Sequence, residues 1–153
     1  MTSAHYHDRD SMGNSVKNSR MTMFPARHSS LPDLVAFLEG FCDATGIDRS
    51  KCLRLNLVLE ELLTNTVSHG HRGDSDAPVW VTLAADNDTV RIAYEDVAPP
   101  FNPYARISEV APDTPIESRR VGGLGVFLTK ELAATYDYAY VFGRNRIDLA
   151  FAR

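Results

Sequence analysis

The order of the predicted elements indicates an α+β fold, a two-layer sandwich in which helices cover one face of a mixed, mostly antiparallel sheet. The patterning predicts one strand, two helices, two strands, a long loop, a third helix and two closing strands. Short polar turns join the strands of each pair, which favours antiparallel pairing. Because strands and helices do not alternate, the sequence disfavours a doubly wound parallel sheet.

Length and composition fit one globular domain. The 153 residues are 44% hydrophobic and 24% charged, ordinary values for such a domain. The formal net charge of −4 argues against a general nucleic-acid binder, so no direct nucleic-acid partner is expected. The apolar runs are too short to span a membrane and the polar start does not resemble a secretory signal, so we expect a cytoplasmic protein without a membrane partner. Cys42 and Cys52 lack a metal-binding spacing and are expected to be reduced, packed thiols.

The amino-terminal segment differs in composition from the rest of the chain. Residues 1–20 lack apolar periodicity and are rich in Ser, Asn, Asp and Arg, which predicts a disordered arm. The folded domain is expected over residues 21–153. Residues 21–26 alternate as a short strand does, and Pro25 within them suggests the edge of a sheet.

Two helices are predicted next. Ser30 is a candidate cap for the first helix, and Gly46 is placed to end it. Asp48 can cap the second helix, which is expected over residues 49–69 with Gly70 as its stop. The remaining elements are strands over residues 79–83, 90–96, 136–142 and 147–151, a long loop over 97–121, a helix over 122–134, and a turn at 143–145.

Glu61 and Asn65 form the most informative feature of the second helix. They lie four residues apart, so both project from one face of the helix, one turn apart, among mostly apolar neighbours. Burying these polar groups is costly unless a polar ligand lies beside them. An amide oxygen suits Mg²⁺ and a nearby carboxylate can act as a base, or the two side chains can simply form a solvated helix face. Glu60 lies about 100° around the helix from Glu61, so the register with Asn65 selects Glu61.

Two further signals follow in the chain, and each also has a purely structural interpretation. Asp96 shares the core-facing parity of its strand and can accept a hydrogen bond from an exocyclic amine, or it can cap a turn. The Gly122-Gly123-Leu124-Gly125 run precedes a helix, where backbone N–H groups can hold phosphate, or it can allow two elements to pack closely.

Taken together and in this order, these motifs resemble those of the Bergerat-fold ATPases, the group that includes histidine-kinase catalytic domains, type II topoisomerases and mismatch-repair ATPases. The closer resemblance is to the small anti-sigma-factor serine kinases of bacteria, over roughly residues 20–153. The matching segments are the asparagine box at 61–65 with His69-Gly70, the first glycine box at 95–103, the second at 122–128, and the closing hairpin at 143–149. A catalytic domain of a sensor histidine kinase matches less well, because the chain lacks a dimerisation helix pair and a phenylalanine-rich lid.

The resemblance implies a fold of the Bergerat type and a role for each matching residue. Asn65 is expected to bind Mg²⁺, Glu61 to activate the attacking hydroxyl, and Asp96 to bind the adenine amino group of ATP. The amides of Gly122, Gly123, Leu124 and Gly125 are expected to hold phosphate. Arg119 and Arg120 either reach the terminal phosphate or are solvated arginines of the lid. One position departs from the family pattern, because Ala98 stands in the nucleotide-binding first glycine box where the family usually has glycine.

The resemblance also implies a function and partners. The expected activity is that of a serine/threonine protein kinase and anti-sigma factor, which phosphorylates a serine of an antagonist of the sulfate-transporter/antagonist (STAS) type. A sigma factor is a further expected partner, and a homodimer an expected assembly. The alternative, which rests on Ala98, is a protein-interaction switch of the same fold that binds nucleotide weakly or lacks catalysis.

Overall fold

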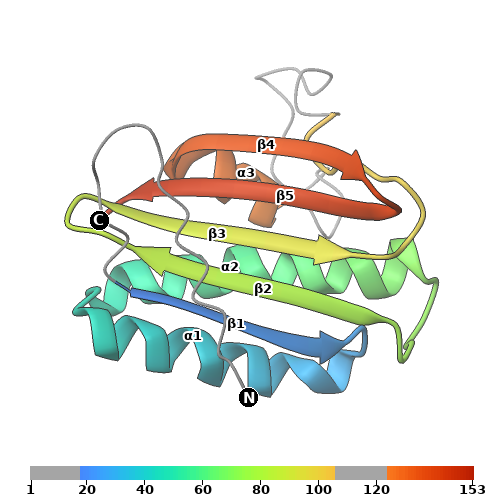
Figure 1. The fold of residues 1–153 in the computed structure, drawn as a ribbon, viewed down its shortest axis with the longest axis horizontal. Helices are drawn as coiled ribbons and strands as arrows, with labels where there is room; N and C mark the ends of the chain where they lie inside the picture. Colours follow the sequence, from blue (N-terminus) through green and yellow to red (C-terminus); the bar gives the residue numbers. More distant parts are fainter. Residues whose placement is uncertain (1–17, 106–123) are drawn as a thin grey trace, which may run out of the picture.

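The computed structural model describes residues 18–105 and 124–153, so the predictions for residues 1–17 and 106–123 lie outside the described residues. A five-stranded sheet in the order β1-β2-β3-β5-β4 forms one layer and the helices form the other (Figure 1). All four strand pairs are antiparallel, so the α+β prediction is confirmed and no parallel pair occurs among the described strands. The strands are β1 Asn18–Pro25, β2 Pro78–Ala85, β3 Thr89–Asp96, β4 Ala133–Val141 and β5 Arg144–Ala152.

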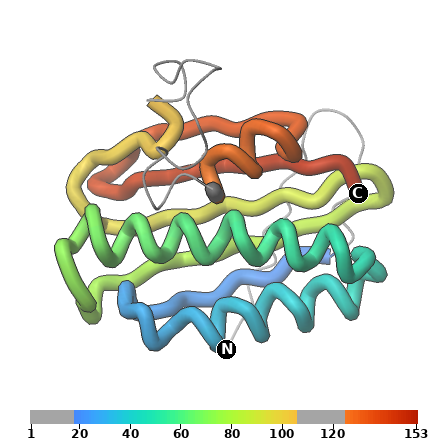
Figure 2. Tube along the Cα trace, turned by 180° about the vertical axis from the view of Figure 1, so that it is seen from behind, coloured from blue at the N-terminus to red at the C-terminus, as the bar shows by residue number. Residues whose placement is uncertain are grey.

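The helices lie on one face of the sheet, as Figure 2 shows from behind. The α-helices are α1 Leu31–Thr45, α2 Arg49–Asn65 and α3 Leu124–Leu132. A short 3-10 helix, η1 His28–Ser30, precedes α1, and a five-residue π-helix, η2 Thr66–Gly70, continues α2. Within the described part of the chain, no helix is long and apolar enough to cross a membrane.

The core forms between the helices and the inward rows of β2, β3 and β5. Buried and half-buried residues alternate along β2 and β3, as a sheet with one covered face requires. Val90, Ile92 and Tyr94 are buried in β3, and Asp96 is the last buried residue of the same row. The predicted parity of Asp96 is therefore confirmed, and a carboxylate lies at the end of a core-facing row.

The predicted helix boundaries are largely confirmed. Gly46 ends α1 in the left-handed region with φ of 72°, where a side chain would be strained. Asp48 caps α2, because its Oδ1 accepts a hydrogen bond from the Lys51 amide at 3.0 Å. Ser30 differs from the prediction: its hydroxyl donates to the Pro25 carbonyl at 2.8 Å and makes no cap bond to α1.

Three boundaries differ from the prediction. The third helix, expected to run to residue 134, ends at Leu132, and residues 133–134 belong to β4. The first strand begins at Asn18, so residues 18–20, expected in the arm, pair with β2. The closing turn consists of Phe142 and Gly143, both in the left-handed region with φ of 51° and 75°. Asn145, expected in this turn, therefore lies within β5 and pairs with Asp96 of β3. This one-step difference brings a polar side chain into the site described next.

Candidate functional site

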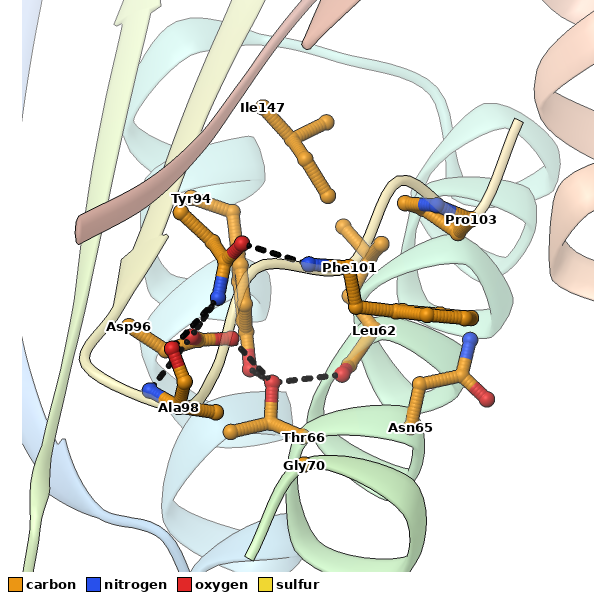
Figure 3. Close-up of a pocket in the computed structure, with 11 residues that line it drawn as sticks. Leu62, Asn65, Thr66, Gly70, Tyr94, Asp96, Ala98, Phe101, Pro103 and Ile147 are labelled. Atoms are coloured by element: carbon orange, nitrogen blue, oxygen red, sulfur yellow. Dashed lines mark hydrogen bonds between the residues drawn. The ribbon is translucent and has the colours of Figure 1, made fainter. Parts of the chain in front are cut away.

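A small cavity lies where the end of α2, the end of β3 and the start of β5 meet (Figure 3). Its volume is about 20 Å³, which is room for about one water molecule. Three of the predicted site residues line it together, namely Asn65, Asp96 and Ala98. The other lining residues are Leu62, Thr66, Gly70, Tyr94, Phe101, Pro103, Asn145 and Ile147.

Asp96 is the charged group at the centre of this site. Its side chain is only 6% exposed, so its oxygens need hydrogen-bond donors in place of water. Oδ2 accepts from the Thr66 hydroxyl at 2.6 Å, and Oδ1 accepts from Asn145 Nδ2 at 2.8 Å and from the Ala98 amide at 3.0 Å. The bond to Ala98 is the turn-capping contact, so Asp96 both caps a turn and lies in the site.

A chain of hydroxyl groups supports the carboxylate from α2 and β3. The Tyr94 hydroxyl lies 2.7 Å from Thr66 Oγ1. Burial raises the pKa of Tyr94, which keeps the phenol protonated and able to donate. Since Thr66 gives its single hydrogen to Asp96, Tyr94 donates to Thr66. We call Asp96, Thr66, Asn145 and Tyr94 the Asp96 cluster.

Asn145 joins this cluster to the loop after β3. Its Nδ2 donates to Asp96, to the Ala98 carbonyl at 3.0 Å and to the Pro99 carbonyl at 3.1 Å. Its Oδ1 accepts from the Phe101 amide at 2.9 Å and from the Tyr138 hydroxyl at 2.7 Å. One buried side chain thus ties β5 to β3, β4 and the loop, and it fixes the position of Phe101 beside the cavity.

Ala98 fits its position without backbone strain. Among the described residues other than glycine, only Arg72 and Phe142 have positive φ, so Ala98 does not need the left-handed region. A Cβ placed on Gly70 would lie 2.7 Å from the Ala98 Cβ. The Ala98 methyl group therefore occupies space that Gly70 leaves open at the end of η2. Strain at Ala98, the basis for doubting nucleotide binding, is absent.

Glu61 lies apart from the Asp96 cluster, one helical turn before Asn65. Its Oε1 is buried and has no hydrogen-bond partner among the described residues. Burial raises the pKa of Glu61, and the nearby His69 opposes part of this shift. A Cβ placed on Gly125 would lie 2.2 Å from the Glu61 Cβ, so the first turn of α3 packs directly against Glu61. Of the two interpretations of the glycine run, close packing therefore applies at Gly125.

Asn65 completes what we call the Glu61 cluster, which consists of Glu61, Asn65 and Gly125. Figure 3 shows the Asn65 side chain outside the hydrogen-bond network around Asp96. No group of three or more His, Cys, Asp or Glu side chains able to hold a metal occurs in the described part of the chain. Mg²⁺ typically takes one or two protein ligands and completes its shell with phosphate and water, so this donor set fits Mg²⁺ bound with a nucleotide.

The remaining predicted residues are only partly described. Leu124 is the first residue of α3, while Arg119, Arg120, Gly122 and Gly123 lie outside the described residues. Sequence analysis missed Thr66 and Asn145. Thr66 follows Asn65 directly and lies four residues after Leu62 on the buried face of α2, which is the signal that identifies it in retrospect.

The chain belongs to the family of histidine kinase-like ATPase domains, whose sequence profile matches residues 24–151. It is similar to the serine-protein kinase RsbW of Listeria monocytogenes serotype 4a (strain HCC23), with 28% identity over 98 residues, 62% of each chain. RsbW of Listeria innocua serovar 6a (strain ATCC BAA-680 / CLIP 11262) is similar to the same extent. The matched region thus spans less than two thirds of these relatives.

A solved structure supports the fold. The crystal structure of the RsbU and RsbW domains of Rv1364c from Mycobacterium tuberculosis superposes with a TM-score of 0.59 and 18% identity. The superposition covers 90% of this chain and 33% of that one. At this identity the likeness concerns the fold, which agrees with the predicted two-layer α+β sandwich.

Proposed function

We propose that this chain binds ATP with Mg²⁺ at the Asp96 and Glu61 clusters and transfers the γ-phosphoryl group to a serine or threonine of a partner protein. The observation that carries the proposal is the buried, unpartnered Oε1 of Glu61, one turn from Asn65 and against the start of α3. A buried polar atom without a partner is costly, and active sites are where such costs are retained. Membership of a family of ATPase domains supports the same function.

The Asp96 cluster is suited to bind the adenine base. Asp96 Oδ1 already accepts two hydrogen bonds and Oδ2 accepts one. A carboxylate oxygen accepts about two such bonds, so one acceptor position of Oδ2 is left for an exocyclic amino group. Because the cavity holds about one water molecule, binding of the base requires Phe101 and Pro103 to move outward. Both residues lie in the loop that Asn145 holds.

The Glu61 cluster is suited to the phosphate end of the nucleotide. The Asn65 amide oxygen would hold Mg²⁺, which supplies positive charge against the phosphates when bound. The start of α3 adds the backbone amides of Leu124 and Gly125 and the positive end of a helix dipole. We include Gly122, Gly123, Arg119 and Arg120 in this proposal on the strength of the sequence motif alone.

Glu61 is the proposed base. A carboxylate whose pKa is raised by burial accepts a proton more readily than an exposed one. It would take the proton of the partner's hydroxyl as that oxygen forms a bond to the γ-phosphorus. The bond from this phosphorus to the β,γ-bridging oxygen breaks, and ADP leaves with the electron pair. Positioning and charge stabilisation do most of the work in such a transfer, which suits a site with few reactive side chains.

The proposed partner is an antagonist of the STAS type, and the proposed biological role is that of a cytoplasmic anti-sigma factor that also binds a sigma factor as a homodimer. These proposals rest on the similarity to serine-protein kinases RsbW. A switch that binds partners without catalysis is the second candidate. The observation that favours it is the small volume of the cavity, which the loop after β3 closes.

The decisive assay uses γ-labelled ATP, Mg²⁺ and a STAS-type antagonist from the same organism. We expect label on a serine or threonine of the antagonist, a loss of at least about 100-fold in rate for Glu61→Gln, and unchanged activity for Glu60→Gln, the neighbouring carboxylate. Label that is acid-labile would indicate phosphohistidine and overturn the proposal. An unlabelled antagonist that still binds the chain would favour the non-catalytic switch.

A further inference from the structure

The two cysteines of the chain meet at the opposite end of α2 from the Asp96 cluster. Cys42 lies in the last turn of α1 and Cys52 in the first turn of α2, ten positions later. Both thiols are free and buried, as expected, and both line the same cavity. The turn between α1 and α2, visible in Figure 2, connects the helix ends that carry them. Two thiols on one cavity can react with each other, which a single buried thiol cannot.

A second cavity gives small molecules a route to this pair. It has a volume of about 180 Å³, much larger than the cavity at Asp96. Both thiols line it, together with Glu39, Asp43, Ile47, Arg49 and Leu53. A cysteine packed in a closed apolar core is inert because no reagent reaches it. The cavity removes that protection at Cys42 and Cys52 while leaving the surrounding helices in place.

We propose that Cys42 and Cys52 form an oxidisable dithiol, which a small disulfide entering this cavity converts reversibly to an intramolecular disulfide. In the first step a thiolate sulfur of one cysteine bonds to a sulfur of the reagent, the S–S bond of the reagent breaks, and one small thiolate leaves. In the second step the other cysteine attacks the mixed disulfide and releases the second small thiol. The protein loses two electrons and two protons, and the reagent is reduced to two thiols.

The order in which the two cysteines react follows from their surroundings. Cys52 is 6% exposed and Cys42 only 1%, so Cys52 is the thiol that the reagent meets first. Burial raises the pKa of Cys42, and the nearby Cys52 raises it further. Once Cys52 is capped in a mixed disulfide, its own contribution to this shift is lost. Cys42 then deprotonates more easily and attacks a sulfur that is already adjacent.

A metal site is a poorer explanation of the same pair. Structural zinc requires about four ligands, and the described residues contain no group of three or more His, Cys, Asp and Glu side chains able to hold a metal.

The test treats the folded, full-length protein with 2-hydroxyethyl disulfide and measures its mass without reduction. We expect a monomer lighter by two hydrogen atoms, and a return to the original mass with dithiothreitol. Trypsin cuts at Arg49 and Lys51, between the two cysteines, so the oxidised protein must yield two peptides joined by a disulfide. A stable mixed disulfide, a disulfide-linked dimer, or no reaction in the wild-type protein would each overturn the proposal.

Single serine variants assign the two roles. Cys42→Ser is expected to stop at the mixed disulfide on Cys52, whereas Cys52→Ser is expected to react at least about tenfold more slowly. Equal rates for the two variants would contradict the assigned order. If either variant is not folded by circular dichroism, the peptide analysis of the wild-type protein still decides whether the bond forms.

Discussion

At the Asp96 cluster, the protein supplies a donor to each carboxylate oxygen, whereas at the Glu61 cluster it leaves a buried carboxylate oxygen without a partner. Asp96 lies at the end of β3 in the sheet layer, and Glu61 lies on α2 in the helix layer. The hydrogen bonds of Asp96 are therefore made within the folded protein, whereas Glu61 Oε1 accepts none from the described residues. We therefore expect the hydrogen bonds of the Asp96 cluster to stabilise the fold, and the unpartnered oxygen of Glu61 to destabilise it.

The two clusters should therefore respond oppositely to removal of polar groups. A residue of the Asp96 cluster leaves several buried donors or acceptors unpaired when it is removed, which costs about 1–3 kcal/mol for each group. Removing the charge of Glu61 relieves a cost that the folded protein already bears. Measured stabilities of single variants test this contrast without any ligand.

The largest effect is expected for Asn145→Ala. It leaves Asp96, Phe101 and Tyr138 without their partner, and we expect the free energy of unfolding to fall by about 3 kcal/mol. For a domain of this size this lowers the thermal midpoint by about 6–12 °C. Tyr138→Phe is the milder control, since it removes one donor and should cost about 1 kcal/mol. If Asn145→Ala lowers the free energy of unfolding no more than Tyr138→Phe does, the stabilising role of the Asp96 cluster is contradicted.

Gly125→Ala tests the contact between α3 and the Glu61 cluster. The added methyl group would lie 2.2 Å and 2.4 Å from two carbons of Glu61, so the two helices must separate, at a cost of about 2 kcal/mol. Gly40→Ala is a matched control, because its methyl group would meet only the end of the Arg20 side chain at 3.9 Å. Alanine is favoured over glycine inside a helix, so this control should gain about 0.5–1 kcal/mol. Destabilisation in both variants would show that the Glu61 contact is not the cause.

The smallest effect, and the one of opposite sign, is expected for Glu61→Gln. Because burial raises the pKa of Glu61 above its ordinary value of 4.5, the folded state holds this proton more tightly than the unfolded chain. Wild-type stability therefore falls as the pH rises from below 4.5 through the folded pKa. The variant does not titrate there, and we expect it to be more stable by up to about 1 kcal/mol at neutral pH.

The same measurement at lower pH serves as the control for Glu61→Gln. The difference between variant and wild type should shrink as the pH falls below 4.5, where Glu61 is protonated in both states. Denaturant titrations across this range measure the difference. A variant less stable than the wild type at neutral pH would show that Glu61 is satisfied in the folded protein.

The sequence analysis predicted the two carboxylates of the site, but it did not predict the hydrogen-bond partners of Asp96. Strand parity places Asp96 in the core row, and helical spacing places Glu61 and Asn65 on one face. These periodicities depend only on neighbouring residues, so they can be predicted from the sequence alone. The partners of Asp96 come from α2 and β5, and which residues meet depends on the register of distant strands.

Asn145 shows how a small local error hides a residue that lines the candidate site. The run Gly143-Arg144-Asn145 has the composition of a turn, and sequence analysis placed the turn there. The observed turn uses Phe142 in the left-handed region, a conformation that a bulky aromatic residue rarely adopts. The turn therefore begins one residue earlier than composition indicates, and Asn145 moves into β5 opposite Asp96.

The most direct test of the proposed site is thermal unfolding of the wild-type protein and of Asp96→Asn, each with and without Mg²⁺–ATP. A ligand at about 100 times its dissociation constant stabilises by about 2.7 kcal/mol, which raises the midpoint of a domain of this size by about 5–10 °C. We expect this rise in the wild type and none in Asp96→Asn, each relative to its own midpoint without nucleotide. An equal rise in both proteins, or no rise in the wild type, would contradict the assignment of the Asp96 cluster as the nucleotide site.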